Sequence, residues 1–301
     1  MTTLETSGSK ALRLYPPPPK DFDPFTATVE DMKKHGLPLR PDPGAQPSLA
    51  ALWERQAQRY RSFDHLEPRP DTATAAKNAL APLGVLDPIE TCGYIAETTG
   101  ATIGVLFLTW TVPDLHYNAS PIGAPNQLHT TVGLGTANAR SDRAPGFLDV
   151  HVEMTVDSGD NVTAGMWAQG VGNINLPVKP GDLISGSLCL EANPQGTAAY
   201  FLANETSGQT MNFVIDSGLP PADTVYAAVS RSTNNSQEPP DYNPLARFGA
   251  VYFDEISVFT STGPLSLTSG EAVTMVNETG ATLATPVSLN DYAFKVVDAA
   301  A

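Results

Sequence analysis

Three titratable side chains occupy every second position in the segment 147–154, which reads FLDVHVEM. Side chains in an extended strand alternate between two faces, so Asp149, His151 and Glu153 would share one face while the apolar residues between them point into a core. Carboxylates beside an imidazole are groups that general acid–base catalysis uses. The same alternation is also typical of any antiparallel strand with one solvated face, and in that interpretation the trio has no chemical role.

The elements that must position these residues are strands. From Gly93 onward, short apolar segments are separated by Gly, Pro, Asn and Asp, with almost no helical period. Turn sequences such as Pro180-Gly-Asp182 join neighbouring antiparallel strands. We therefore expect an all-β fold, an antiparallel sandwich of two sheets with meander or jelly-roll connectivity. The expected strands are Tyr94–Glu97, Thr102–Val112, His129–Gly135, Phe147–Val156, Asn161–Gln169, Leu183–Glu191, Thr197–Asn204, Thr210–Asp216, Thr224–Arg231, Gly249–Thr260 and a terminal pair near Ala272 and Phe294.

The first 85 residues differ in texture from residues 86–301, because they are rich in proline and broken into short pieces. Thr28–Asp31 resembles a capping box that opens a short helix ending at Gly36. Ser48 is a suitable cap for a second helix, Leu49–Tyr60. This Pro-rich, partly helical arm has too little apolar surface to fold alone, so it must either lie on the following domain or remain partly disordered. A docked arm would lie across the sandwich and cover an edge strand or a groove.

Composition excludes several functions. A net charge of -15, with 17 basic residues that do not cluster, argues against nucleic-acid binding. No apolar run approaches the length of a membrane span, and the N-terminus lacks an export signal, which favours a cytoplasmic location, although export by another route stays open. The five histidines show no metal-ligand spacing, so we expect neither metal nor cofactor. Whether Cys92 and Cys189 pair cannot be decided from spacing, and the oligomeric state is open.

Six short motifs follow one another along this part of the chain: Cys92-Gly-Tyr-Ile95, Thr109-Trp-Thr-Val-Pro113, Thr131-Val-Gly-Leu-Gly135, Val178-Lys-Pro-Gly-Asp182-Leu-Ile184, Asn204-Glu-Thr-Ser-Gly-Gln209 and Leu245-Ala-Arg-Phe-Gly249-Ala-Val-Tyr-Phe253. Their order over residues 92–290 resembles that of the eqolisins, the glutamic peptidases. The resemblance implies a concanavalin-like sandwich of two bent sheets.

In that family, catalysis is attributed to a glutamate, which acts as general base and then as acid, and to a glutamine, which stabilises the oxyanion. The glutamine lies in a segment that aligns with Phe147–His151 and places Asp149 in its position. The glutamate lies in a segment that aligns with Thr224–Arg231 and offers Val225 or Tyr226. The resemblance therefore predicts a sandwich that has lost the catalytic pair.

The leading prediction is a non-catalytic eqolisin-like protein whose concave face binds a peptide, a glycan or a protein partner. Strand parity suggests lining residues, although it leaves open which sheet faces the groove. The first alternative is an acid-acting glutamic-type endopeptidase with a divergent site. The second is a jelly-roll glycoside hydrolase that uses Asp149 and Glu153. The predicted lining residues are Trp167, Gln169, Tyr226, His151, Tyr200 and Asn212.

Overall fold

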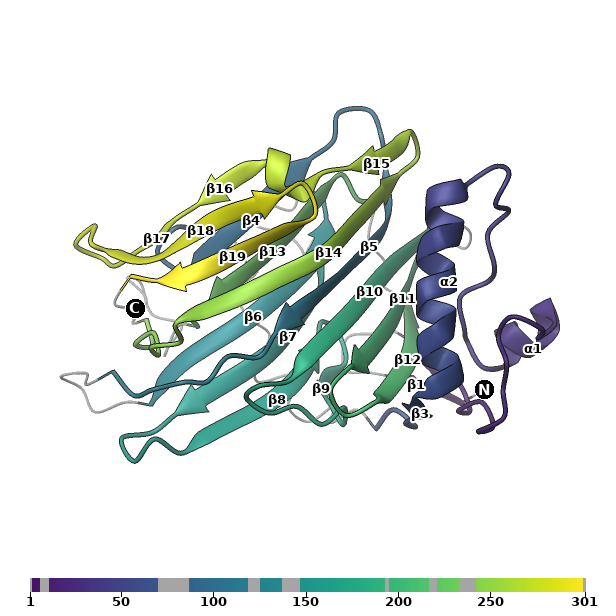
Figure 1. Ribbon diagram of the computed structural model, residues 1–301, viewed down its shortest axis with the longest axis horizontal. Coiled ribbons are helices and arrows are strands. Elements are labelled where there is room, and N and C mark those ends of the chain that lie inside the picture. The colour runs from purple at the N-terminus through teal and green to yellow at the C-terminus, as the bar shows by residue number, and fades with distance from the viewer. Residues whose placement is uncertain are drawn as a thin grey trace.

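The computed structural model describes residues 2–5, 11–69, 87–118, 125–136, 147–192, 195–216, 221–232 and 242–299 (Figure 1). Within these ranges the chain forms two antiparallel sheets that pack face to face, with helices confined to short segments. The predicted all-β, two-sheet sandwich is therefore confirmed. Residues 70–86, which contain the predicted boundary of the arm near residue 85, lie outside the described ranges.

The larger sheet has twelve strands in the described part of the chain. Its hydrogen-bonded order is β1 (Thr2–Glu5), β2 (Ala11–Leu14), β12 (Gln209–Asp216), β11 (Gln195–Asn204), β10 (Leu183–Ala192), β5 (Ile103–Thr111), β14 (Ala250–Thr260), β19 (Ala293–Asp298), β18 (Thr282–Asn290) and β17 (Met275–Val276). Two short strands attach to this sheet, β15 (Gly263–Leu265) on β14 and β3 (Asp64–His65) on β12.

The smaller sheet has seven strands by the same description. They follow the order β16 (Glu271–Val273), β4 (Thr91–Glu97), β13 (Thr224–Ser230), β6 (Asn126–Gly135), β7 (Phe147–Val156), β8 (Val162–Ala168) and β9 (Gly172–Ile174). A 3₁₀ turn, η2 (Leu267–Ser269), precedes β16.

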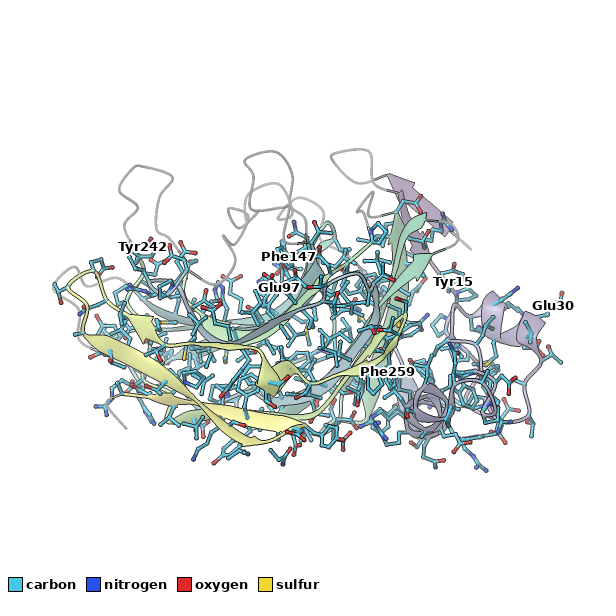
Figure 2. All side chains as sticks on the ribbon, turned by 90° about the horizontal axis from the view of Figure 1, so that it is seen from above. Tyr15, Glu30, Glu97, Phe147, Tyr242 and Phe259 are labelled. Carbon is cyan, nitrogen blue, oxygen red and sulfur yellow. The ribbon has the colours of Figure 1, made fainter. Side chains whose placement is uncertain are left out.

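The core lies between the two sheets. Alternate residues of β7, namely Leu148, Val150, Val152 and Met154, are fully buried there and pack with the inward residues of the other sheet. The intervening residues of β7 consequently point to the outer face of the seven-stranded sheet. Figure 2 shows the two sheets as layers, with Phe147 at the outer face of the seven-stranded sheet.

The N-terminal arm covers the twelve-stranded sheet. Strand β2 pairs with β12 through Leu12↔Ile215 to Leu14↔Phe213, and β3 adds to the same strand. Helix α2 (Pro47–Ser62) lies across the outer face of this sheet (Figure 1). Its residues Trp53, Ala57 and Tyr60 pack against Ala199, Phe201 and Val214.

Both predicted helices form, but only the first begins with the predicted cap. Helix α1 (Val29–Lys34) opens with the expected capping box, in which the Thr28 hydroxyl accepts from the Asp31 N–H. Helix α2 begins earlier than predicted, and Ser48 is not its cap. The helix starts at Pro47 because proline is well suited to the first helical position. Its N-cap is Gln46, which makes no side-chain capping bond.

Strands form at both of the places predicted near the end of the chain, but they lie in different sheets. Strand β16, which contains Ala272, pairs with β4 in the smaller sheet, whereas β19, which contains Phe294, pairs with β14 and β18 in the larger one. Strand β18 was not predicted, since nearly all of its side chains are exposed or half-buried and only Ala284 is buried. A strand that buries so few residues has no apolar alternation to detect.

Cys92 and Cys189 do not form a disulfide with each other. Cys92 is buried in the core, and burial raises the pKa of its thiol to about 12. Neither helix in the described part of the chain has the length and apolar character that a bilayer span requires.

Candidate functional site

Strand register aligns the outward side chains of the seven-stranded sheet in rows that cross β13, β6 and β7. The first row is Tyr226, Gly133 and Asp149, and the second is Ala228, Thr131 and His151. The third is Ser230, His129 and Glu153. Strand β8 extends the second row with Trp167 and the third with Gly165. The trio on β7 is thus one column of a larger array of polar side chains.

In the first row, the absence of a side chain at Gly133 gives space to the Tyr226 ring. A Cβ atom built at Gly133 would lie only 2.6 Å from two carbons of this ring and 2.7 Å from the phenol oxygen. The ring therefore extends from β13 across β6 toward Asp149 on β7. Phe147 packs edge-on against it, with 5.5 Å between the ring centroids.

The second and third rows are joined by a stack of three aromatic rings. The His129 and His151 rings are nearly parallel, with 5.2 Å between their centroids. The Trp167 ring also stacks on His151, with 4.7 Å between the centroids. The Asp149 carboxylate lies 3.4 Å from Nδ1 of His151. The stack holds the His151 ring in place, and the contact with Asp149 orients it.

This array is almost closed to solvent, although it lies on the outer face of a sheet. The exposed fraction is 2% for His151 and Trp167, 3% for His129 and Tyr226, and 6% for Asp149. Burial, aided by the charge of His151, lowers the pKa of His129 to about 3. Burial and the charge of Asp149 raise the pKa of Tyr226 well above its usual value. Near neutral pH, His129 is therefore uncharged and Tyr226 keeps its phenolic proton.

Several buried polar atoms of the array have no hydrogen-bond partner among the residues that the structure describes. They are the Tyr226 hydroxyl, the indole nitrogen of Trp167 and both ring nitrogens of His129. Unpaired buried polar groups are rare in folded proteins, because each one loses its hydrogen bonds to water without replacement. Four such atoms lie on this one face of the sheet, where a ligand would find donors and acceptors that are not yet used.

The predicted lining residues separate into two groups. Trp167, Tyr226 and His151 lie together in the array, and the Gln169 backbone N–H donates to the Asp149 carbonyl oxygen at 3.0 Å. Tyr200 instead faces the core between the sheets, where its ring stacks on Phe213.

Asn212 faces the N-terminal arm. Its amide donates to the carbonyl oxygens of His35 and Gly36 at 3.0 Å each. Parity within a strand thus groups residues correctly but does not reveal which face of which sheet they occupy.

Two members of the array, His129 and Gly133, were not among the predicted site residues. Both lie on β6, where they alternate with the apolar residues Leu128, Val132 and Leu134, and this alternation is the sequence signal that places them on one face. Only the register of β6 with β7 and β13 brings them to the site. In the described residues, no group of three or more His, Cys, Asp or Glu side chains is arranged to hold a metal ion.

A two-sheet antiparallel sandwich with a polar row on the outer face of one sheet is the architecture of this chain. The chain belongs to the peptidase A4 family, whose model matches residues 90–297. The predicted resemblance to the eqolisins is therefore confirmed. A comparison with curated proteins finds no match.

Solved structures of that family share the fold. One is SCP-B, a member of the eqolisin family, in complex with the tripeptide Ala-Ile-His, with a TM-score of 0.54, 16% identity and coverage of 69% of this chain and 98% of that chain. Another is scytalido-glutamic peptidase with a peptide-based transition-state analogue, with a TM-score of 0.53, 15% identity and the same coverage. At this identity the likeness concerns the fold alone.

The structure also distinguishes the two residues that the family pattern offers in the glutamate position. Val225 is fully buried between the sheets, while Tyr226 lies in the outer row with Asp149.

Proposed function

We propose that this chain is a non-catalytic member of the peptidase A4 family that binds an extended peptide on the outer face of its seven-stranded sheet. The observation that carries the proposal is the first row of the array, in which Tyr226 and Asp149 occupy the positions that the family resemblance gives to a glutamate and a glutamine. A tyrosine with a raised pKa does not act as a base, and an ionised aspartate cannot donate to an oxyanion.

The unpaired donors of the array support a peptide as the ligand. Tyr226 and Trp167 each offer one buried N–H or O–H group without a partner, and neutral His129 offers one more. Backbone carbonyl oxygens of an extended peptide recur at regular intervals and accept such bonds. SCP-B and scytalido-glutamic peptidase were solved with a tripeptide and a peptide-based analogue, which favours the same ligand class here.

A glycan has less support. Sugar rings stack on open aromatic faces, but one face of the Trp167 ring is covered by His151. The glycosidase alternative meets a further obstacle. Asp149 and Glu153 are four residues apart on one strand, which separates their Cα atoms by roughly 13 Å. The stacked His151 ring lies between them, where a retaining glycosidase needs carboxyl groups about 5 to 5.5 Å apart.

One observation favours a second candidate, a hydrolase with an exchanged pair. A carboxylate and a neutral hydrogen-bond donor are both present in the first row, with the carboxylate on β7 and the donor on β13. In this scheme Asp149 takes a proton from water and the resulting hydroxide attacks the peptide carbonyl carbon. Tyr226 donates to the oxyanion, and Asp149 then returns the proton to the amine as the C–N bond breaks.

The experiment that separates these functions measures retention and cleavage together. The full chain is incubated with a synthetic peptide library between pH 3 and pH 7, bound peptides are recovered, and new termini are counted by mass spectrometry. We expect retention without new termini, and loss of retention in Trp167→Ala. The matched control Tyr252→Ala removes an exposed aromatic residue from the other sheet and should retain the same peptides.

Cleavage that disappears in Asp149→Asn would overturn the binding proposal and establish the exchanged pair. Retention of glycans on an array, without retention of peptides, would overturn the choice of ligand.

A further inference from the structure

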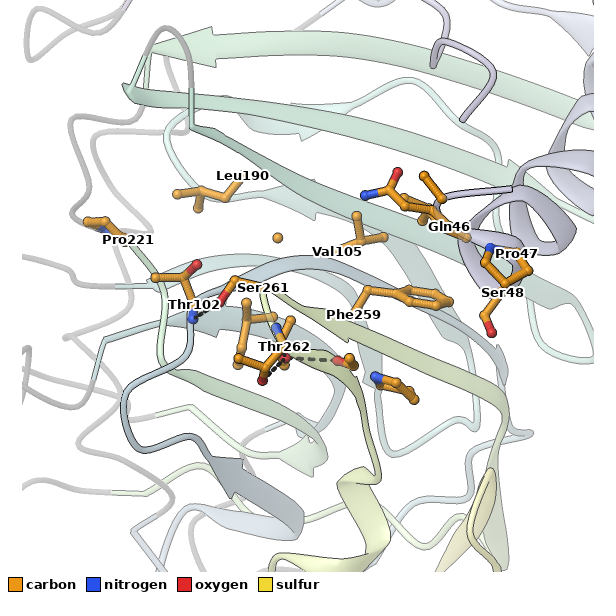
Figure 3. Close-up of a pocket in the computed structure, with 17 residues that line it drawn as sticks. Gln46, Pro47, Ser48, Thr102, Val105, Leu190, Pro221, Phe259, Ser261 and Thr262 are labelled. Atoms are coloured by element: carbon orange, nitrogen blue, oxygen red, sulfur yellow. Dashed lines mark hydrogen bonds between the residues drawn. The ribbon is translucent and has the colours of Figure 1, made fainter. Parts of the chain in front are cut away.

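We propose that a groove at one end of the twelve-stranded sheet binds a small, uncharged amphipathic molecule and that this molecule holds the N-terminal arm in place. The groove has a volume of about 820 Å³, within the usual range for ligand sites (Figure 3). It is lined by the start of β5, the end of β10, the β14–β15 hairpin and the first turn of α2. None of these residues belongs to the polar array, so this inference is independent of the proposed peptide site.

The groove arises because neighbouring strands separate. Strands β10 and β5 pair from Leu183↔Thr111 only as far as Cys189↔Val105, although both continue beyond this point. On the other side of β5, the register with β14 shifts between Phe259 and Thr260. The side chains of Leu190, Val105 and Phe259 are left around the resulting gap, as Figure 3 shows.

The chemistry of the lining indicates the class of ligand. None of the seventeen lining residues carries a charge, in a chain that has 32 acidic and 17 basic residues. Aliphatic, aromatic and proline side chains form most of the surface, with hydroxyl groups at the rim. An ion placed here would lose its hydration without finding a counter-charge, so the lining favours a neutral molecule with an apolar body.

Most hydroxyl groups at the rim are already bonded within the protein. The Thr260 hydroxyl donates to the Gly263 carbonyl oxygen at 2.8 Å, and the Ser261 hydroxyl accepts from the Thr102 N–H at 3.1 Å. The polar side chains on the α2 side, Gln46 and Ser48, are exposed, and Gln46 makes no capping bond. One carbonyl or hydroxyl oxygen on the ligand, placed at this end, would match those donors.

The groove also has two independent walls. Residues 45–49 of the arm form one wall, and β5, β10, β14 and β15 of the sandwich form the rest. A molecule that contacts both walls binds only when the arm is docked. By linkage, it stabilises the docked arm by an amount that grows with the ratio of its concentration to its Kd.

The test uses two naphthalene dyes, prodan, which is neutral and carries one carbonyl oxygen, and the anionic 1-anilinonaphthalene-8-sulfonate. We expect saturable, blue-shifted prodan fluorescence with the full chain and at least about tenfold weaker binding of the anionic dye. Val105→Trp, which fills the groove, should weaken prodan binding at least about tenfold. Thr262→Trp, on the exposed hairpin turn, blocks the same space from the rim and keeps the test valid if Val105→Trp does not fold.

The matched control is Leu289→Trp, which adds the same ring to an exposed position outside the groove and should leave prodan binding unchanged. Saturating prodan should also slow tryptic cleavage between Arg40 and Arg61 of the arm. Absence of saturable prodan binding, equal binding of both dyes, unchanged binding in Thr262→Trp, or unchanged cleavage of the arm would each overturn the proposal.

Discussion

The outer faces of the two sheets both bury polar side chains, but they satisfy them differently. On the twelve-stranded sheet, Arg59 of α2 donates through Nε to Glu205, which also accepts from the Ser185 hydroxyl at 2.5 Å. The Trp53 indole nitrogen donates to the Pro38 carbonyl oxygen at 2.7 Å. On the seven-stranded sheet, the Trp167 indole N–H and the Tyr226 hydroxyl have no hydrogen-bond partner among the described residues.

Hydrogen-bond pairing therefore separates two surfaces of this molecule: the sheet face that the arm covers, and the sheet face proposed to bind a peptide. Where the arm lies on the sheet, the Arg59 guanidinium, the Ser185 hydroxyl and the Trp53 indole N–H each meet an acceptor from the arm or the sheet. The polar array has a comparable degree of burial without the matching acceptors. Buried donors that lack acceptors, beside equally buried donors that have them, are expected at a binding site without its ligand.

The largest expected effect concerns acid. His129 has a pKa near 3 in the folded protein and about 6.5 when unfolded, so the unfolded chain binds more protons between these values. Its contribution to stability is complete above pH 6.5 and is lost as the pH falls toward 3, a difference that approaches about 5 kcal/mol. Urea unfolding between pH 7 and pH 4 should show a shallower pH dependence in His129→Phe than in the parent chain.

The control for this experiment is His116→Phe, which makes the same exchange at an exposed histidine outside the array. Equal pH dependence in His129→Phe and the parent would show that the array does not keep His129 neutral.

The next effect tests the satisfied face. Arg59→Ala leaves the Glu205 carboxylate, whose side chain is 15% exposed, without its counter-charge. We expect a loss of about 3 kcal/mol in urea unfolding. Lys20→Ala removes a fully solvated partner of Asp64 and should cause no measurable change. If the two variants unfold alike, the arm is not held by this ion pair.

A smaller effect is expected at the centre of the array. Gly133→Ala places a methyl group against the Tyr226 ring and should cost about 2 kcal/mol. Gly165→Ala, on β8 and two strands further from Tyr226 than Gly133, meets open space and should be neutral. In a double-mutant cycle, Tyr226→Ala should remove most of the penalty at Gly133, and strict additivity would contradict the proposed contact.

The smallest effect compares two hydroxyl deletions. Tyr226→Phe removes an unpaired buried hydroxyl and should raise the free energy of unfolding by about 1 kcal/mol, while weakening peptide retention. Ser185→Ala removes a paired hydroxyl from the other face and should lower it by about 1 kcal/mol. Opposite signs in thermal unfolding would support the comparison, and a shared sign would break it.

Most strands were predictable because each buries one face against the core, and β7 was predicted with its observed bounds. Helix α1 was predictable from its capping residues alone. The pairing of the terminal strands could not be predicted, because it depends on information that is not local. The partners of β16 and β19 depend on which sheet each strand joins, and nothing in either segment encodes that choice.

The candidate site was predictable only in part for the same reason. Parity placed Asp149, His151 and Glu153 on one face, and motif order narrowed the second position to Val225 or Tyr226. His129 became part of the site only through cross-strand register. The approach of the Tyr226 ring toward Asp149 depends on Gly133 on β6, the strand between them, which no pattern within β7 or β13 could indicate.

The pairing of β2 with β12 has a consequence for biosynthesis. Arg13 of β2 contacts Asp216 of β12 across 203 positions of the chain. The ribosome makes the first of these residues long before the second, and at 5 to 20 residues per second the interval is about 10 to 40 seconds. Throughout that interval the nascent arm has no docking surface, so its apolar residues are available to holdase chaperones until β12 emerges.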